Sequence, residues 1–155
     1  MKRGELIMKA ISLWQPWASA IPDLKRIETR SWPTNYRGPI AIHAAKTKRG
    51  INDGAIFPLV QNLKVYGINI HKLPFGCFVV TADLIDCILI PEISMGLIHL
   101  NGSFARRIVC IRDTEYLFGD YTPGRYAWIF DNIKVLGKPI PAVGRQGLWN
   151  NEEVY

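Results

Sequence analysis

Apolar positions divide the chain into short segments, and most of these segments have the spacing of β-strands. Alternating or continuous apolar runs bounded by turn residues are typical of strands. We predict strands at 9–13, 25–32, 40–45, 75–90 and 126–135, with one more inside 137–149. Strands therefore outnumber helices and occur toward both ends of the chain.

Two segments favour helices, and two others are irregular. Residues 15–21 predict a short helix with Pro16 at its first position, where the missing N–H is not needed. Residues 47–63 also look helical, although Gly50, Gly54 and Pro58 interrupt them. We expect a loop with a short helix over 91–107 and irregular structure over 112–123. The pattern predicts one α+β domain: a small β-barrel of about five to six mostly antiparallel strands, flanked by a few helices.

Length and composition agree with a single globular domain over residues 1–155. The chain is 48% hydrophobic and 21% charged, which excludes disordered, collagen-like and coiled-coil proteins. No apolar run approaches the roughly 20 residues that span a bilayer, so we expect no membrane partner. The number and spacing of the cysteines favour a cytoplasmic protein. Residues 1–7 predict a flexible extension, with a start at Met1 or Met8, and residues 150–155 predict a frayed tail.

Cysteine and histidine spacing predicts neither a disulfide scaffold nor a metal site. Cys77, Cys87 and Cys110 are odd in number and far apart, so we expect reduced thiols. His43 lies in an apolar strand, where a hydrogen-bonded core histidine is the favoured interpretation and a proton carrier the alternative. We therefore expect no metal and no cofactor, unless the protein is a nuclease that recruits magnesium through the phosphates of its substrate.

Positive charge is concentrated in the first third of the chain. Residues 1–50 hold ten Lys and Arg against three Asp and Glu, a net charge of +7. Residues 51–155 hold nine against ten, a net charge of −1. This asymmetry favours an anionic partner, and nucleic acid before a membrane surface. A basic protein without an anionic partner is the alternative.

Aromatic and cationic residues alternate in the segment 12–46, a pattern that suits single-stranded nucleic acid because bases stack on rings while cations follow phosphates. We expect Trp14 and Trp128 to be core residues, and at least one of Trp17 and Trp32 to face a ligand. The candidate nucleic-acid-binding residues are Trp17, Lys25, Glu28, Arg30, Trp32, Tyr36, Arg37 and Lys46.

The most specific local feature is Lys25-x-x-Glu28-x-Arg30. On a strand, Glu28 and Arg30 share a face and can pair, while Lys25 lies on the other face unless a bulge or a helix-to-strand turn intervenes. Such a cluster could orient a phosphate or a base edge, because Arg offers a bidentate fork and Glu accepts from an exocyclic amine. A solvated strand with alternating charges is the other interpretation.

These residues and their neighbours resemble the ASCH domain, a member of the PUA-like superfamily of small β-barrels. The signature G-x-K-x-x-E-x-R is matched by Lys25, Glu28 and Arg30, with Asp23 in place of the leading Gly. Further resemblance lies in 15–18, 31–32, 37–44, 124–128 and 144–149, so that it extends from Met8 to Trp149. The resemblance implies a cleft between barrel and helices that binds RNA or a modified nucleoside, lined by these signature residues.

Three functions remain open at this point. The first is an RNA-binding domain that holds single-stranded RNA or a modified nucleoside in a basic cleft. The second is a hydrolase that acts on nucleic acid, with Lys25 and Glu28 as catalytic residues: a metal-assisted ribonuclease, or an N4-acetylcytidine amidohydrolase as some relatives are. That amidohydrolase branch has Thr where this chain has Glu28, which disfavours it. The third is a protein-interaction or transcription-coregulator domain. The oligomeric state is not indicated.

Overall fold

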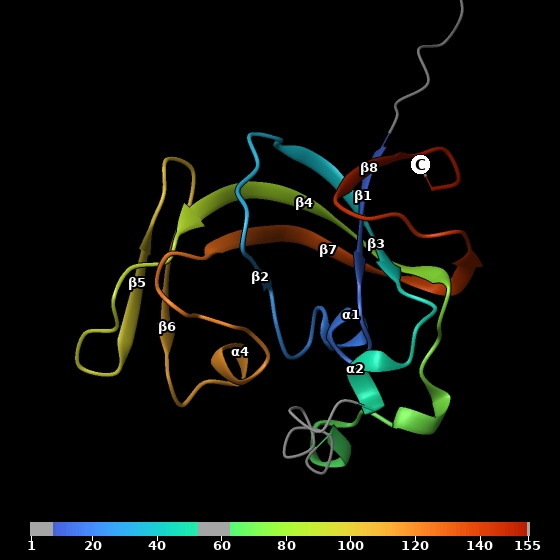
Figure 1. Cartoon of the computed structure of the whole chain (residues 1–155), viewed down its shortest axis with the longest axis horizontal. Coiled ribbons are helices and arrows are strands. Elements are labelled where there is room, and N and C mark those ends of the chain that lie inside the picture. Colours follow the sequence, from blue (N-terminus) through green and yellow to red (C-terminus); the bar gives the residue numbers. More distant parts are fainter. Residues whose placement is uncertain (1–7, 53–62, 155) are drawn as a thin grey trace, which may run out of the picture. The chain divides into compact units, whose positions relative to one another are not determined.

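The computed structural model describes residues 8–52 and 63–154, and its main feature is a mixed sheet of six strands (Figure 1). The order across this sheet is β2–β7–β4–β3–β1–β8. Its strands are β1 (Met8–Leu13), β2 (Ile27–Arg30), β3 (Gly38–Ala44), β4 (Cys77–Leu89), β7 (Tyr126–Pro141) and β8 (Leu148–Asn151). A separate two-stranded ribbon consists of β5 (Leu97–Asn101) and β6 (Arg106–Cys110).

The α+β class is confirmed, but the closed barrel is wrong. In the part of the chain that the structure describes, the strand order ends at β2 and β8, which are four residues each and do not pair with one another. The sheet is mixed. β1 pairs in parallel with β3, from Lys9 opposite Ile40 to Leu13 opposite Ala44, and antiparallel with β8.

The helices are single turns. They are α1 (Trp17–Ala20), α2 (Arg49–Asn52) and α4 (Thr114–Leu117), with 3-10 turns η2 (Leu63–Tyr66) and η3 (Ile70–Lys72). The helices predicted over 15–21 and 47–63 are thus shorter where they are described, and residues 53–62 lie outside the described ranges. Pro22 follows α1 closely, and a proline at that position disfavours continuation of the helix. The segment 112–123, predicted as irregular, contains α4.

The loop with a short helix predicted over 91–107 is wrong, because this segment supplies β5 and the start of β6. Ile98 and Leu100 are buried while His99 and Asn101 are exposed, which is the period of a strand with one covered face. β5 and β6 pair antiparallel, with His99 opposite Ile108.

Contacts within the chain divide it into two compact units, each with its own apolar cluster. Unit 1 comprises residues 1–19, 39–81 and 134–155, and unit 2 comprises residues 20–38 and 82–133. In unit 1, Phe78 packs with Ala10, Ala41 and Val154. In unit 2, the residues buried together are Ile27, Ile88, Ile90, Ile98, Leu100, Ala105, Val109, Tyr121, Ala127 and Ile129.

The last described residues pack against the sheet and do not form the frayed tail that we expected. Asn151 lies in β8 and is buried, and its side-chain oxygen accepts the N–H groups of Glu153 and Val154. Val154 is buried in the cluster around Phe78 because these hydrogen bonds turn the chain inward. The predicted extension, residues 1–7, lies outside the described ranges, as does Tyr155.

None of the helices in the described ranges has the length and apolar character needed to cross a bilayer. The three cysteines are free, as predicted. His43 is buried, and its ring nitrogens lie 3.2 Å from Ser12 Oγ and 3.0 Å from the Ala142 carbonyl oxygen. The prediction of a hydrogen-bonded core histidine is therefore confirmed.

Within unit 2, a buried carboxylate ties the β5–β6 turn to β4. Asp86 on β4 is 2% exposed and accepts the N–H groups of Phe104, at 2.8 Å, and Ala105, at 3.0 Å. Arg37 donates to its other oxygen at 3.1 Å. A Cβ at Gly102 would lie only 2.0 Å from Asp86 Oδ2, so glycine is required there. Burial raises the pKa of Asp86, but these hydrogen bonds outweigh it and hold that pKa below its ordinary value.

We predict that Asp86→Asn lowers the free energy of unfolding by about 2–4 kcal/mol, because an amide cannot accept all of these N–H groups. Asp83→Asn is the matched control on the same strand. Asp83 accepts an exposed hydrogen bond from Asn132, and its substitution should cost under about 0.5 kcal/mol. Urea unfolding at pH 7 measures both values.

The same pair of variants tests the pH dependence. A carboxyl whose pKa is lowered by folding adds stability above its unfolded pKa of about 3.9, and this stability is lost as the pH falls through the folded value. Below about pH 4, the wild-type protein should lose stability more steeply than Asp86→Asn. Equal slopes would show that Asp86 is not the anchor described here.

Candidate functional site

Lys25 lies in a turn that precedes β2, and this turn decides where its side chain goes. The N–H groups of Leu24 and Lys25 both donate to the Ala20 carbonyl, at 2.9 and 3.2 Å, so the chain closes on the end of α1. Asp23, which occupies the place of the signature glycine, is exposed in this turn. Because Lys25 precedes the strand, the alternation of β2 does not place its side chain on the face away from Glu28.

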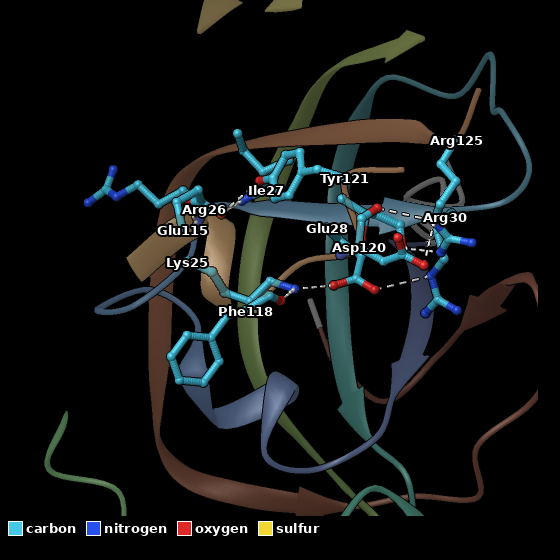
Figure 2. A network of polar contacts seen from close by, with 11 residues as sticks. Lys25, Arg26, Ile27, Glu28, Arg30, Glu115, Phe118, Asp120, Tyr121 and Arg125 are labelled. Atoms are coloured by element: carbon cyan, nitrogen blue, oxygen red, sulfur yellow. Dashed lines mark hydrogen bonds and ion pairs between the residues drawn. The ribbon is translucent and has the colours of Figure 1, made fainter. Parts of the chain in front are cut away.

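Lys25, Glu28 and Arg30 form a chain of alternating charges (Figure 2). Lys25 Nζ lies 2.5 Å from Glu28 Oε2 and also donates to the Phe118 carbonyl at 3.2 Å. Glu28 Oε1 lies 3.4 Å from Arg30 Nε. Lys25 is 1% exposed and Glu28 is 8% exposed, whereas the Arg30 side chain is 25% exposed. The chain therefore runs from a fully buried ammonium to a guanidinium that reaches solvent.

The alternation of β2 separates this charge chain from the apolar core of unit 2. Ile27 belongs to the buried apolar cluster, while Glu28 and Arg30 lie on the other face. The antiparallel register sets Glu28 opposite Trp128 and Arg30 opposite Tyr126 on β7. Glu28 and Arg30 can pair on this face, as the spacing of the signature predicted.

Trp32 extends this face beyond the end of β2. Its ring packs edge-on against the buried ring of Trp128, with centroids 4.8 Å apart, and its carbonyl accepts the Trp128 indole N–H at 3.4 Å. Trp32 itself is half-buried. The face thus carries a fixed aromatic ring within two residues of Arg30.

A second carboxylate, Glu115 on α4, fixes the backbone between Lys25 and Glu28. It accepts the N–H groups of Arg26 at 2.7 Å and Ile27 at 3.1 Å, and the hydroxyl of Tyr121 at 3.5 Å. Burial raises the pKa of Glu115, although the N–H donors and the charge of Lys25 oppose this shift. Burial also raises the pKa of Tyr121, and the carboxylates of Glu115 and Glu28 add to that shift. Sequence patterns contain no signal for Glu115, because its partners are backbone groups far away in the chain.

An outer ion pair lies close to Arg30. Arg125 Nε is 3.3 Å from Asp120 Oδ2, and Arg125 also donates to the Thr29 carbonyl at 3.4 Å (Figure 2). The backbone N–H of Asp120 also donates to the Thr29 hydroxyl oxygen at 2.9 Å. These contacts hold the segment that precedes β7 against β2.

The other predicted binding residues do not join this cluster as one group. Arg37 donates from Nη1 to the carbonyls of Thr34 and Tyr36 and from Nη2 to Asp86, so both of these nitrogens are engaged within unit 2. Tyr36 is half-buried in the same segment. Trp17 and Lys46 belong to unit 1.

Over residues 8–52 and 63–154, no group of three or more His, Cys, Asp or Glu side chains is arranged to hold a metal ion. The acidic groups of the site are instead satisfied by Lys25, Arg30 and backbone N–H groups. The arrangement can orient Arg30 toward an anion, and it neutralises Glu28 from two sides.

Comparison with known proteins connects the chain to one family. The sequence model of the ASCH domain matches residues 11–99, which include the whole Lys25-x-x-Glu28-x-Arg30 signature. Activating signal cointegrator 1 of Homo sapiens is 36% identical over 83 residues, and that of Mus musculus is 35% identical over 83 residues. Each match covers 50% of this chain and 14% of the relative, so the chain corresponds to a small part of those proteins.

We predict strong coupling between Lys25 and Glu28. Lys25→Met should lower the free energy of unfolding by about 3 kcal/mol, because it removes one partner of a buried ion pair. The double variant Lys25→Met/Glu28→Gln should cost at least about 1 kcal/mol less than the sum of the two single variants. Urea unfolding of the four proteins measures this, with the exposed Lys64→Met as control. Additive effects would contradict a coupled pair.

Glu115 should make the stability fall as the pH rises. A carboxyl with a raised folded pKa adds stability below its unfolded pKa of about 4.3, and that contribution is lost as the pH passes through the folded value. Glu115→Gln cannot ionise, so its stability should decline less than that of the wild-type protein above about pH 4.3. Urea unfolding at intervals from about pH 4 to pH 8 gives the two slopes. Parallel slopes would exclude a raised pKa at Glu115.

Proposed function

Because this chain belongs to the ASCH domain family, as its signature predicted, we propose that it is an RNA-binding domain. Its ligand is single-stranded RNA or a modified nucleoside, held at the outer end of the Lys25–Glu28–Arg30 chain. ASCH domains are generally linked to nucleic acids, and the RNA itself is the part of the proposal that needs a test.

The observation that carries the proposal is the graded burial of the three charges. Burying an ammonium and a carboxylate costs several kcal/mol each, and an apolar pair of similar volume often gives equal stability. A buried pair whose carboxylate also touches a partly exposed arginine is suited to fixing that arginine in one orientation. Arg30 then presents its fork to a phosphate or to a base edge.

The three signature residues have different roles in this proposal. Arg30 touches the ligand, and Trp32 offers a ring edge or face on which a base can stack. Lys25 acts through Glu28, since its ammonium is buried and already engaged by Glu28 and the Phe118 carbonyl. Lys25 is therefore a positioning residue here, whereas the hydrolase hypothesis makes it catalytic.

The test is binding of a fluorescein-labelled single-stranded RNA of mixed sequence, measured by anisotropy at fixed salt. Arg30→Ala should weaken binding at least tenfold. Arg26→Ala is the matched control, because it removes the same charge from a neighbouring exposed side chain that points away from Glu28 (Figure 2). Arg26→Ala should stay within about twofold of the wild-type protein.

Two results would contradict the proposal: no binding of this RNA or of modified nucleosides by the wild-type protein, or equal losses in Arg30→Ala and Arg26→Ala. Urea unfolding of Arg30→Ala shows whether a loss of binding comes from unfolding. The RNA should also be recovered intact on a denaturing gel, with magnesium and with EDTA. Fragments that require magnesium and disappear with Lys25→Met would favour the ribonuclease instead.

A protein-interaction domain is the second candidate, and one observation favours it. Large apolar side chains are exposed around the β5–β6 ribbon, among them Met95, Phe104 and Ile108. Exposed apolar groups of this kind mark many protein-binding surfaces. The name of the matching relatives, activating signal cointegrator 1, also fits a coregulator. Unchanged RNA binding by Ile108→Asp would show that this apolar surface is separate from the RNA site, so that a protein partner can be tested there independently.

A further inference from the structure

The net positive charge of the protein belongs to unit 1 alone. Over the whole sequence, unit 1 holds eleven Lys and Arg against four Asp and Glu, a net charge of +7. Unit 2 holds eight against nine, a net charge of −1. The Lys25–Glu28–Arg30 chain is therefore in the unit that has no excess of cations.

The cations of the two units also differ in the ion pairs that they form. The ion pairs found in the described ranges are Lys25–Glu28, Arg30–Glu28, Arg37–Asp86 and Arg125–Asp120, and all of them lie in unit 2. Among the described residues of unit 1, the acidic ones are Glu152 and Glu153 at the end of the chain. Within the described ranges, none of these ion pairs therefore involves a cation of unit 1.

Three segments of unit 1 gather cations and aromatic rings at one place, which we call the Trp14 patch (Trp14, Lys46, Lys48 and Arg49). α2 packs directly on the segment before α1: a Cβ at Gly50 would lie 3.0 Å from the Trp14 Cβ and 2.2 Å from the Gln15 carbonyl oxygen. The Gln15 side chain is buried and donates to the Pro74 carbonyl at 2.8 Å. Gln15 thus holds the segment 72–76 against the start of α1.

Two cations of the patch lie against this framework. Lys48 Nζ lies over the Phe75 ring, 5.8 Å from its centroid. The side chain of Lys46 lies beside Gly76, where an added Cβ would be 3.7 Å from the Lys46 Cβ. Gly76 in turn donates to the Ala44 carbonyl at 2.8 Å. Lys46, Lys48 and Arg49 are all exposed.

The exposure of Trp14 is a second observation that points to a ligand. We expected a core residue, but its side chain is 43% exposed although it follows a buried strand. The exposed Trp14 lies on the segment that packs against Gly50 of α2, and three exposed cations come shortly before Gly50 in the chain. This combination matches a surface on which bases stack while cations follow phosphates. A membrane surface fits less well, because α1 is four residues long and too short for an interfacial amphipathic helix.

We infer that the Trp14 patch binds the backbone and bases of single-stranded nucleic acid, with Lys46, Lys48 and Arg49 on phosphates and Trp14 stacked on a base. This inference rests on the proposed function, in which single-stranded RNA is the ligand, but it uses none of the signature residues. The patch supplies affinity that depends on salt, and the Arg30 site supplies a fixed polar contact.

The test uses the full chain and a labelled 12-nucleotide single-stranded RNA of mixed sequence, titrated at several salt concentrations between about 50 and 300 mM. The patch variant is Lys46→Gln/Lys48→Gln/Arg49→Gln. The matched control is Arg106→Gln/Arg107→Gln/Arg112→Gln, which removes the same charge from three exposed cations of unit 2. Both variants therefore have the same net charge.

Each phosphate contact to a single strand contributes about 0.7 to the slope of log K against log salt, so the patch variant should lose about 2 from that slope. Its affinity should fall at least tenfold, and the control should keep the wild-type slope within about 0.5. Trp14→Ala should weaken binding by about fivefold or more with an unchanged slope, because stacking releases no counterions. Circular dichroism melting checks that each variant is folded.

Equal losses in the patch variant and the control would overturn the inference, since net charge alone would explain them. Wild-type slope and affinity in the patch variant would also overturn it, while a loss in Arg30→Ala would leave the proposed function standing. The converse, a loss in the patch variant with wild-type binding by Arg30→Ala, would support the patch and contradict the proposed site. Patch-dependent binding to phosphatidylserine vesicles without RNA binding would replace nucleic acid by a membrane surface.

Discussion

The arrangement of unit 2 around the site depends on the burial of the Lys25 ammonium. The side-chain nitrogen of a lysine that is 1% exposed needs hydrogen-bond acceptors in place of water, and Glu28 and the Phe118 carbonyl supply them. This requirement fixes the turn after α1 and the start of β2, and it brings the segment after α4 against both. Glu115 adds to it by accepting two backbone N–H groups between Lys25 and Glu28. The orientation of Arg30 follows from these contacts, because Glu28 holds Arg30 with its second oxygen.

The sequence predicted Lys25, Glu28 and Arg30 as site residues, but not how deeply Lys25 and Glu28 are buried. The spacing of Glu28 and Arg30 indicated a shared strand face, and the register of β2 with β7 agrees. Strand alternation alone predicts Lys25 on the other face of the strand. It does not account for the turn before β2, which hydrogen bonds to the Ala20 carbonyl close. Glu115 could not be predicted, since its contacts with the 26–27 backbone form only after β2 and α4 come together. The same reason explains the segment 91–107: its alternation is short, and the face that it buries is provided by residues distant in sequence.

The sequence predicted the size of the positive charge excess, but not which residues carry it in the folded protein. The first 50 residues and unit 1 both carry a net charge of +7, yet they are different sets of residues. Four cations of the first 50 residues belong to unit 2, which also holds nine acidic residues: Lys25, Arg26, Arg30 and Arg37. Lys64, Lys72, Lys134, Lys138 and Arg145 take their place in unit 1. A basic segment in sequence therefore does not correspond to one basic surface.

This distribution separates two physical requirements of nucleic-acid binding. A cation that must hold one geometry needs a carboxylate beside it, and that carboxylate cancels most of its long-range field. Arg30 meets this requirement, so it contributes orientation and little attraction at a distance. Cations that attract a polyanion must instead stay out of ion pairs with carboxylates, and within the described ranges Lys46, Lys48 and Arg49 belong to none of the ion pairs. One residue cannot satisfy both conditions at the same time, so the two groups of cations differ in what each can contribute to the binding of an anion.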